Sequence, residues 1–209
     1  MFDAALRPLV DLILDPVGRM LARCGVSANQ VSVVGFAFGI GAGAAVAAGA
    51  TVIAMFLFAA NRLCDGLDGA AARARTPTDL GGFLDITLDF IVYSGLVFAF
   101  ALADPANATA AAFLIFSFVG TGTSFLSFAI IAQKRDISTD IRGKKSFFYL
   151  GGLTEGMETI IFLLTVIMIP SSFAALAFVF GALCWITTAT RVQHAVRRLS
   201  RPVHRQTGD

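Results

Sequence analysis

Four aspartates flank a short turn between two long apolar segments, and their types and spacing could support chemistry at a membrane. They are Asp65, Asp68, Asp85 and Asp89. A charge at the centre of a membrane helix costs about 2.5–3.5 kcal/mol, and the stretch holds only two basic residues, Arg73 and Arg75. Divalent cations would compensate this negative charge, and carboxylate oxygens suit Mg²⁺ or Mn²⁺, which also bind substrate phosphates. The sequence therefore predicts metal-dependent phosphate chemistry at a membrane surface.

The spacing of the aspartates predicts that all four face one gap. Asp65 and Asp68 are three residues apart, and Asp85 and Asp89 are four apart. At about 3.6 residues per turn, each pair lies on one side of its helix. The short connection that contains residues 76–78 makes the two helices antiparallel neighbours. Two facing pairs could hold two ions about 3.5–4 Å apart, as two-metal sites do.

The residues around the aspartates form a longer motif. It reads Asp65-x2-Asp68-Gly69-x2-Ala72-Arg73 and then Gly81-x3-Asp85-x3-Asp89. This motif resembles the signature of the CDP-alcohol phosphotransferase family, also called CDP-alcohol phosphatidyltransferases. The spacer between Arg73 and Gly81 is one residue shorter than is usual in the family, and the difference falls in the turn. Gly66 and Gly69 leave room either for a ligand against the backbone or for close helix packing.

The resemblance implies an enzyme that transfers a phosphatidyl group from a CDP-linked lipid to an acceptor alcohol and releases CMP. It implies that Asp65, Asp68 and Asp85 are metal ligands, and that Asp89 shares the metal contact or acts as general base. It also implies a stretch that binds CDP, consisting of Asp65, Gly69, Ala72, Arg73 and Gly81. A homodimer is expected from the resemblance as well. The acceptor alcohol stays open between glycerol phosphate, inositol phosphate, serine and others.

Two further pairs of polar residues are candidates for the site. Asn61 and Arg62 lie one turn before Asp65, and they could contact nucleotide or lipid phosphate, or Arg62 could snorkel to the interface. Glu155 and Glu158 lie one turn apart inside an apolar segment, where a carboxylate pair indicates function by default. They could line or support an acceptor pocket, or they could make structural bonds to an arginine or a neighbouring threonine.

The composition predicts an all-α integral membrane protein. Of 209 residues, 56% are hydrophobic and only 14% are charged, against about 25% charged in soluble domains. A net charge of +2 is too small to indicate nucleic-acid binding. Six segments are long and apolar enough to cross a bilayer, which takes about 20 residues each. They are residues 30–49, 51–73, 82–103, 108–132, 147–169 and 172–193.

The remaining segments complete the predicted organisation. Residues 1–26 contain apolar residues at helical spacing with arginines between them, which predicts an amphipathic helix on the cytoplasmic face of the membrane. Residues 27–195 would form the six-helix catalytic domain, and residues 196–209 a basic tail. None of the sixteen Lys and Arg residues lies in the connections after the first, third and fifth crossings. The positive-inside rule then places both termini and the aspartates in the cytoplasm, in a bacterial inner membrane.

A transporter and an inactive scaffold are the alternatives to an enzyme. A small cation transporter could use the aspartates as an ion path, but transporters spread polar positions through the membrane and often contain an internal repeat. Here the acidic residues cluster at one end of the helices, and no repeat is visible. The complete set of four aspartates argues against a scaffold that has lost activity. The expected partners are the CDP-linked lipid, the acceptor alcohol and membrane lipids.

Overall fold

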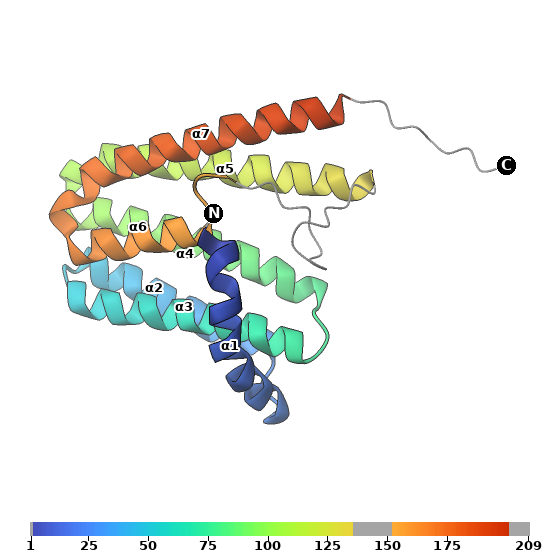
Figure 1. Cartoon of the computed structure of the whole chain (residues 1–209). Helices are drawn as coiled ribbons and strands as arrows, with labels where there is room; N and C mark the ends of the chain where they lie inside the picture. Colours follow the sequence, from blue (N-terminus) through green and yellow to red (C-terminus); the bar gives the residue numbers. More distant parts are fainter. Residues whose placement is uncertain (1, 136–151, 201–209) are drawn as a thin grey trace.

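The computed structural model describes residues 2–135 and 152–200, and every regular element in these ranges is a helix (Figure 1). The long helices are α1 (Phe2–Arg23), α2 (Ala28–Ala47), α3 (Thr51–Ala74), α4 (Asp79–Ala103), α5 (Ala108–Lys134), α6 (Gly156–Met168) and α7 (Phe173–Leu199). Two short 3-10 helices, η1 (Pro105–Asn107) and η3 (Pro170–Ser172), precede α5 and α7. The all-α prediction is therefore confirmed for the described residues.

Four helical segments of the described chain are long and apolar enough to cross a membrane. They are α2, α4, η1 with α5 (Pro105–Lys134), and η3 with α7 (Pro170–Leu199). Helix α3 has a suitable length of 24 residues, but its second half contains the charged residues of the motif. Helix α6 has 13 residues, so it is about 20 Å long. That is shorter than a hydrocarbon core of about 30 Å.

The start of α6 corrects one predicted boundary. The sequence predicts a crossing over residues 147–169, whereas the helix begins only at Gly156. Residues 152–155 are not helical, and Thr154 and Glu155 are buried in the bundle. Residues 147–151 of the predicted range lie outside the described residues. Helix α7 continues to Leu199, so the predicted tail begins inside a helix, and residues 201–209 are not described.

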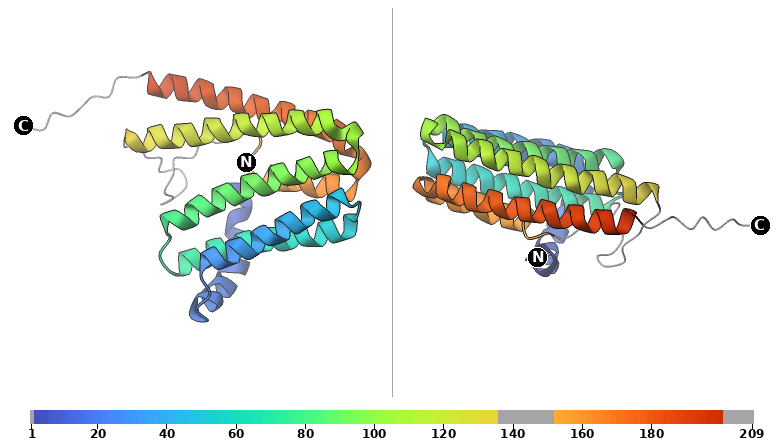
Figure 2. Two further views of the ribbon diagram at one scale, coloured as in Figure 1. Left: turned by 180° about the vertical axis from the view of Figure 1, so that it is seen from behind. Right: turned by 90° about the horizontal axis from the view of Figure 1, so that it is seen from above.

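Helices α2 to α7 run roughly along one axis, and α1 crosses them against α3 (Figures 1 and 2). Helix α2 packs against both α3 and α4, while α5 packs against α7. Small residues allow the close approach of α2. A Cβ added to Gly39 of α2 would come within 3.1 Å of the Asn61 amide nitrogen on α3, and it would collide with Val92 of α4. This packing brings the polar halves of α3 and α4 against α2.

The connections at the two ends of the bundle differ in charge. The turns that contain Gly49, Asp104 and Pro170 line one cavity of about 210 Å³, so three connections without Lys or Arg lie together. At the other end, Ser27 caps α2 and Thr78 caps α4, each accepting a hydrogen bond from a backbone N–H. The aspartates lie toward this second end. The fold therefore keeps the acidic cluster away from the uncharged turns.

Candidate active site

Three of the four aspartates come together across the gap between the polar halves of α3 and α4. These two helices do not pack directly on each other as the sequence predicts, because both pack against α2. One carboxylate oxygen each from Asp65, Asp68 and Asp85 lies within 4.8 Å of the other two. Asp68 is only 7% exposed, and Ser32 of α2 donates a hydrogen bond of 2.5 Å to its Oδ2. An all-oxygen donor set of this kind fits Mg²⁺ or Mn²⁺. The predicted juxtaposition is thus present for three carboxylates, with Ser32 as an additional contact that the sequence did not indicate.

Asp89 lies apart from these three carboxylates in an ion pair with Arg62. The Arg62 Nη2 atom lies 2.7 Å from Asp89 Oδ1, and Nη1 donates to Asp89 Oδ2 at 3.3 Å. The Tyr93 hydroxyl accepts from Arg62 Nη1 at 2.6 Å and donates to Asp89 Oδ2 at 3.2 Å. Arg62 also lies 3.6 Å from the Asp65 carboxylate. The four aspartates therefore divide into a group of three and one that is bound by an arginine.

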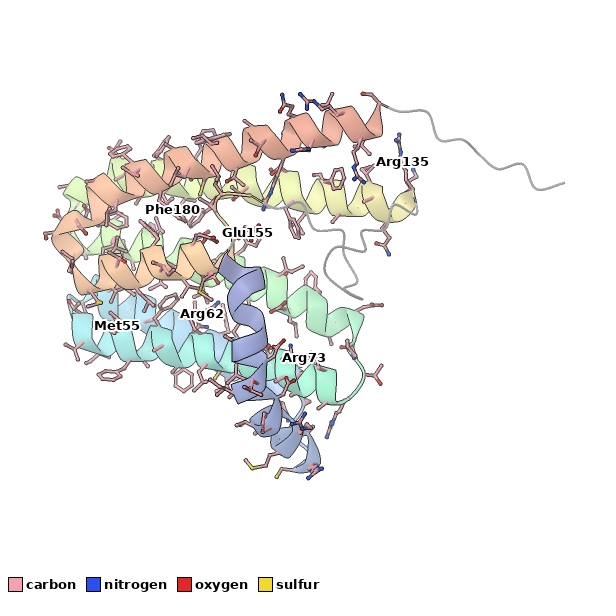
Figure 3. The ribbon with its side chains drawn as sticks, viewed as in Figure 1. Met55, Arg62, Arg73, Arg135, Glu155 and Phe180 are labelled. Atoms are coloured by element: carbon pink, nitrogen blue, oxygen red, sulfur yellow. The ribbon has the colours of Figure 1, made fainter. Side chains whose placement is uncertain are left out.

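The Arg62 side chain points into the bundle (Figure 3). It is 11% exposed, and its Nε donates to the Asn61 side-chain oxygen at 2.8 Å. Asn61 is itself buried and donates to the Gly35 carbonyl of α2 at 2.8 Å. The structure therefore directs Arg62 inward to Asp89 and gives no support to the alternative of snorkelling. Asn61 fixes the orientation of the guanidinium.

Arg73 has a different environment, because it lies beside α1 (Figure 3). Its Nη2 is 2.8 Å from both Asp11 Oδ1 and Asp15 Oδ1. The two glycines of the motif also differ in their surroundings. A Cβ on Gly66 would collide with the end of the Leu14 side chain on α1, whereas a Cβ on Gly69 would meet only Arg73 Nη1, at 3.4 Å. Gly66 therefore allows helix packing, and Gly69 leaves open space.

That space belongs to a cavity of about 680 Å³ at the end of the bundle where α3 and α4 are joined. All residues of the predicted CDP-binding stretch line it: Asp65, Gly69, Ala72, Arg73 and Gly81. Asp68 and Asp85 also contribute to its polar wall, while Leu14, Met157 and Ile160 form an apolar part. The structure therefore brings the CDP-binding candidates and the three-carboxylate group to one cavity.

A second cavity, of about 220 Å³, lies on the other side of α4. Asp85 and Asp89 line it together with Glu155 and Arg191. Arg191 is a buried residue of α7 that donates to the Thr121 carbonyl at 3.1 Å and lies over the Phe125 ring. Sequence reasoning missed Arg191, although an arginine inside the apolar segment 172–193 was a usable signal. This cavity connects a buried cationic side chain with the aspartates of α4.

Glu155 and Glu158 differ in position and in their contacts. Glu155 is the N-cap residue of α6 and lines the second cavity. Glu158 closes a capping box, because its Oε2 accepts from the Glu155 backbone N–H at 3.1 Å. Thr187 of α7 accepts hydrogen bonds from the backbone N–H groups of Leu153 and Thr154 at 3.1 Å. The structure thus supports a structural contribution from both glutamates and a cavity position for Glu155.

Comparison with known proteins identifies the family. The sequence model of the CDP-alcohol phosphatidyltransferases matches residues 25–193. The chain belongs to the CDP-alcohol phosphatidyltransferase family. The resemblance predicted from the aspartate motif is therefore confirmed, and the chain is a transferase of this type.

Relatives of this CDP-alcohol phosphatidyltransferase come from bacteria and archaea. The chain is 48% identical to the inner membrane protein YnjF of Escherichia coli, over 92% of this chain and 94% of YnjF. It is 28% identical to the archaetidylinositol phosphate synthase of Pyrococcus horikoshii, over 93% and 96% of the two chains. The crystal structure of the phosphatidylinositol phosphate synthase PgsA1 of Mycobacterium tuberculosis, with CDP-DAG bound, has the same fold. The structural match to PgsA1 has a TM-score of 0.64 at 22% sequence identity, and it covers 88% of this chain and 94% of PgsA1.

Proposed function

We propose that this chain transfers a phosphatidyl group from a CDP-linked lipid, such as CDP-diacylglycerol, to an alcohol hydroxyl and releases CMP. The observation that carries this proposal is the cavity of about 680 Å³, which is lined by three clustered aspartates and by every residue of the CDP-binding motif. The bound CDP-DAG in the structurally similar PgsA1 also supports a donor of this class. The transfer would belong to phospholipid biosynthesis.

The residues of the cavity have distinct roles in this proposal. Asp65, Asp68 and Asp85 would hold a divalent ion, Mg²⁺ or Mn²⁺. When bound, such an ion would neutralise the diphosphate and the charge that develops on the leaving CMP. Arg73 would bind the diphosphate, and Gly69 with Ala72 and Gly81 would leave room for the nucleotide. Arg73 would then have to contact the diphosphate in addition to, or in place of, Asp11 and Asp15.

Asp89 would act as the general base. The acceptor oxygen forms a bond to the phosphorus that carries the lipid, and the bond from that phosphorus to the oxygen of CMP breaks. The proton of the acceptor hydroxyl would pass to the Asp89 carboxylate, which Arg62 and Tyr93 hold at the second cavity. A positioned base of this kind contributes about 10²–10⁴-fold to the rate. Asp89 lines the second cavity but not the larger one, so the acceptor would approach from the side opposite the donor.

The lining of the second cavity supports the proposal that the acceptor carries a negative charge. Arg191 is buried in its wall, and a buried guanidinium is suited to bind a phosphate group. The relatives described above include an archaetidylinositol phosphate synthase and a phosphatidylinositol phosphate synthase, so an alcohol phosphate such as inositol phosphate is the acceptor we propose. Glu155 would line this acceptor pocket, and Glu158 would support it by capping α6.

We further propose six membrane crossings, α2 to α7, in the inner membrane, with α1 on the cytoplasmic face. Helices α3 and α6 would cross with their polar ends against the cavities rather than against lipid. Leu12, Ile13 and Met20 of α1 are exposed, which suits an interfacial helix. Both termini and the active site would be cytoplasmic, since the uncharged turns lie together at the opposite end. A homodimer is part of this proposal, as the family resemblance implies.

The geometry favours this enzyme over a cation transporter. The cavity at the aspartates and the cavity at the uncharged turns share no lining residue. Between them the described bundle is filled by buried apolar side chains, among them Phe58 and Leu96. A transporter requires polar positions through the depth of the membrane. The described residues therefore give no support to an ion path.

An assay of the purified protein tests the proposed function. The protein is incubated with radiolabelled CDP-diacylglycerol, Mg²⁺ and a panel of acceptors, which includes inositol, inositol phosphate, glycerol phosphate and serine. We expect CMP release that depends on both Mg²⁺ and one phosphorylated acceptor. CMP release with an uncharged acceptor alone would contradict the acceptor proposal. No CMP release with any acceptor would contradict the proposed function itself.

A further inference from the structure

One side chain of α7 holds the backbone that leads into α6. Residues 152–155 are not helical, and Thr154 and Glu155 are buried. Thr187 of α7 is fully buried, and its Oγ1 accepts hydrogen bonds from the backbone N–H groups of Leu153 and Thr154, each at 3.1 Å. A third hydrogen bond of 3.0 Å joins the hydroxyls of Thr154 and Thr187. Buried backbone N–H groups need a partner, and here two of them share one hydroxyl.

The segment before α6 forms one wall of the second cavity. Glu155 and Thr159 line this cavity of about 220 Å³ together with Arg191. The Glu155 carboxylate accepts from the Gly152 N–H at 3.0 Å, and the Glu155 carbonyl accepts from the Thr159 hydroxyl at 2.9 Å. Glu155 lies where the segment joins α6 (Figure 3). The bonds that fix the segment therefore also fix this wall of the cavity.

Close contact with α7 also places the segment beside Arg191. Thr187 and Arg191 are four residues apart, so they lie one turn apart on the same face of α7. Gly152 lies against both of them. A Cβ added to Gly152 would collide with the Thr187 methyl group and would come within 3.4 Å of Arg191 Nη2. The contact between Gly152 and Thr187 therefore sets the distance between the start of α6 and the Arg191 guanidinium.

We propose that Thr187 is a positioning residue for the acceptor alcohol. Its hydroxyl holds the start of α6 against α7, so that Glu155 and Arg191 face one pocket from two helices. Thr187 does not itself line that cavity. Without the hydroxyl, two buried N–H groups would lose their partner, and the segment would have to move to satisfy them. This inference rests on the proposed function, because it concerns the pocket in which we place the acceptor.

The kinetics of Thr187→Val test this proposal. Valine keeps the shape of threonine but cannot accept a hydrogen bond, so the segment should shift. The purified full chain is assayed for CMP release with CDP-diacylglycerol, Mg²⁺ and inositol phosphate. We expect the KM for inositol phosphate to rise about tenfold, which corresponds to about 1.4 kcal/mol, while the KM for CDP-diacylglycerol stays unchanged. A merely structural role would lower the fraction of active protein and leave both KM values as they are.

Two matched variants serve as controls. Thr187→Ser keeps the hydroxyl and should keep the KM of the wild type. Thr188→Val removes a hydroxyl that donates within α7, to the Cys184 carbonyl, and it should leave both KM values unchanged. Hydrogen exchange at the amides of Leu153 and Thr154 should be faster in Thr187→Val than in these two variants. An unchanged KM for inositol phosphate in folded Thr187→Val, or an equal rise in both KM values, would overturn the proposal.

Gly152→Ala tests the same contact from the other side, and it decides the question if Thr187→Val does not fold. The added Cβ should push the segment away from Thr187 and raise the KM for inositol phosphate. Gly152→Ala combined with Thr187→Ser lacks the methyl group with which the Cβ collides. We expect this double variant to recover a KM close to that of the wild type. A double variant as impaired as Gly152→Ala would overturn the proposal.

The proposed function fails on a different result, which is the absence of CMP release from the wild type. The binding of inositol phosphate, measured by calorimetry, then takes the place of KM. An affinity about tenfold weaker in Thr187→Val than in the wild type would support the positioning role. Equal affinities, or no binding to the wild type, would overturn it.

Discussion

At the scale of single residues, Asp68 and Asp89 carry the same side chain in two different environments. Asp68 is buried, bonded to Ser32 and within reach of two other carboxylates, as a metal ligand requires. Asp89 is bound by Arg62 and Tyr93 and faces the second cavity. We therefore propose that an aspartate side chain holds an ion at position 68 and accepts a proton at position 89.

Asp68→Ala should remove nearly all activity while the protein still inserts and folds. The variant deletes one of three carboxylates that would hold the ion, but it also relieves repulsion between buried negative charges. The matched control is Asp79→Ala, since Asp79 is exposed in the first turn of α4. CMP-release rates measure both variants. If Asp68→Ala retains more than about a tenth of wild-type activity, equivalent to a loss below about 1.4 kcal/mol, the ligand assignment is wrong.

Asp89→Asn should lower turnover by about 10²–10⁴-fold, because the amide cannot accept the acceptor proton. Binding of the CDP-linked donor should change far less, since the three other aspartates and Arg73 line the cavity of about 680 Å³ in which we place the donor. Calorimetry with CDP and Mg²⁺ measures binding, and CMP release measures turnover. Equal losses in both quantities would indicate that Asp89 is a metal ligand first and that another group is the base.

At the scale of helices, the packing of α1 against α3 connects the N-terminal helix with the donor cavity. Gly18 of α1 lies against the α3 backbone, because a Cβ there would be 2.5 Å from the Ala70 Cβ and 2.7 Å from the Ala70 carbonyl carbon. This contact places Asp11 and Asp15 on Arg73. The position of a residue in the CDP-binding stretch therefore depends on a helix outside the motif.

Gly18→Ala should displace α1 and weaken donor binding, because the added Cβ meets backbone that cannot yield. Overpacking of this kind costs about 1–3 kcal/mol. Trypsin cleavage at the exposed residues Arg19 and Arg23 should become faster, and KM for the donor should rise. The control is Gly95→Ala on α4, where an added Cβ would have no neighbour within 4 Å. Unchanged cleavage and KM in Gly18→Ala would show that α1 does not position Arg73.

The sequence predicted the helices of the first half of the bundle better than the start of α6. The aspartate spacing predicted that carboxylates of α3 and α4 face one gap, because helical periodicity and a short turn suffice for this, and three of them do. The predicted direct packing of these two helices was wrong, because both pack against α2 instead. The beginning of α6 depends instead on Glu155 as a cap and on Thr187 of α7, which bonds the backbone before the helix. Hydropathy cannot distinguish such buried non-helical backbone from a helix. The contacts of Ser32 and Arg191 likewise join helices that are far apart in sequence, so the local sequence does not reveal them.

At the scale of the whole molecule, the two ends of the bundle have different chemistry. One end holds the uncharged turns around Gly49, Asp104 and Pro170. The other holds the donor cavity and the α3–α4 turn with its flanking arginines. This polarity is the physical reason why we propose a cytoplasmic active site, since positively charged segments are retained on that side.

Cysteine labelling tests this orientation. In a background where Cys24, Cys64 and Cys184 are replaced by serine, single cysteines are introduced at Ala106, Ser171 and Ser200. A membrane-impermeant maleimide added to intact cells should label the first two positions, which lie at the uncharged end, and leave Ser200→Cys unlabelled. Permeabilised cells provide the control for reactivity at Ser200→Cys. External labelling of that position would place the active site on the outer face.

We propose that the chain uses the aspartate cavity to transfer a phosphatidyl group from a CDP-linked lipid to an alcohol. Proteoliposomes that contain the wild-type chain and CDP-diacylglycerol test it most directly, when CMP and the lipid product are quantified together after Mg²⁺ and inositol phosphate are added. We expect CMP and a new phosphodiester lipid to form in equal amounts, and neither to form with Asp68→Ala. CMP accompanied by phosphatidic acid alone would indicate hydrolysis, and it would contradict the proposed transfer.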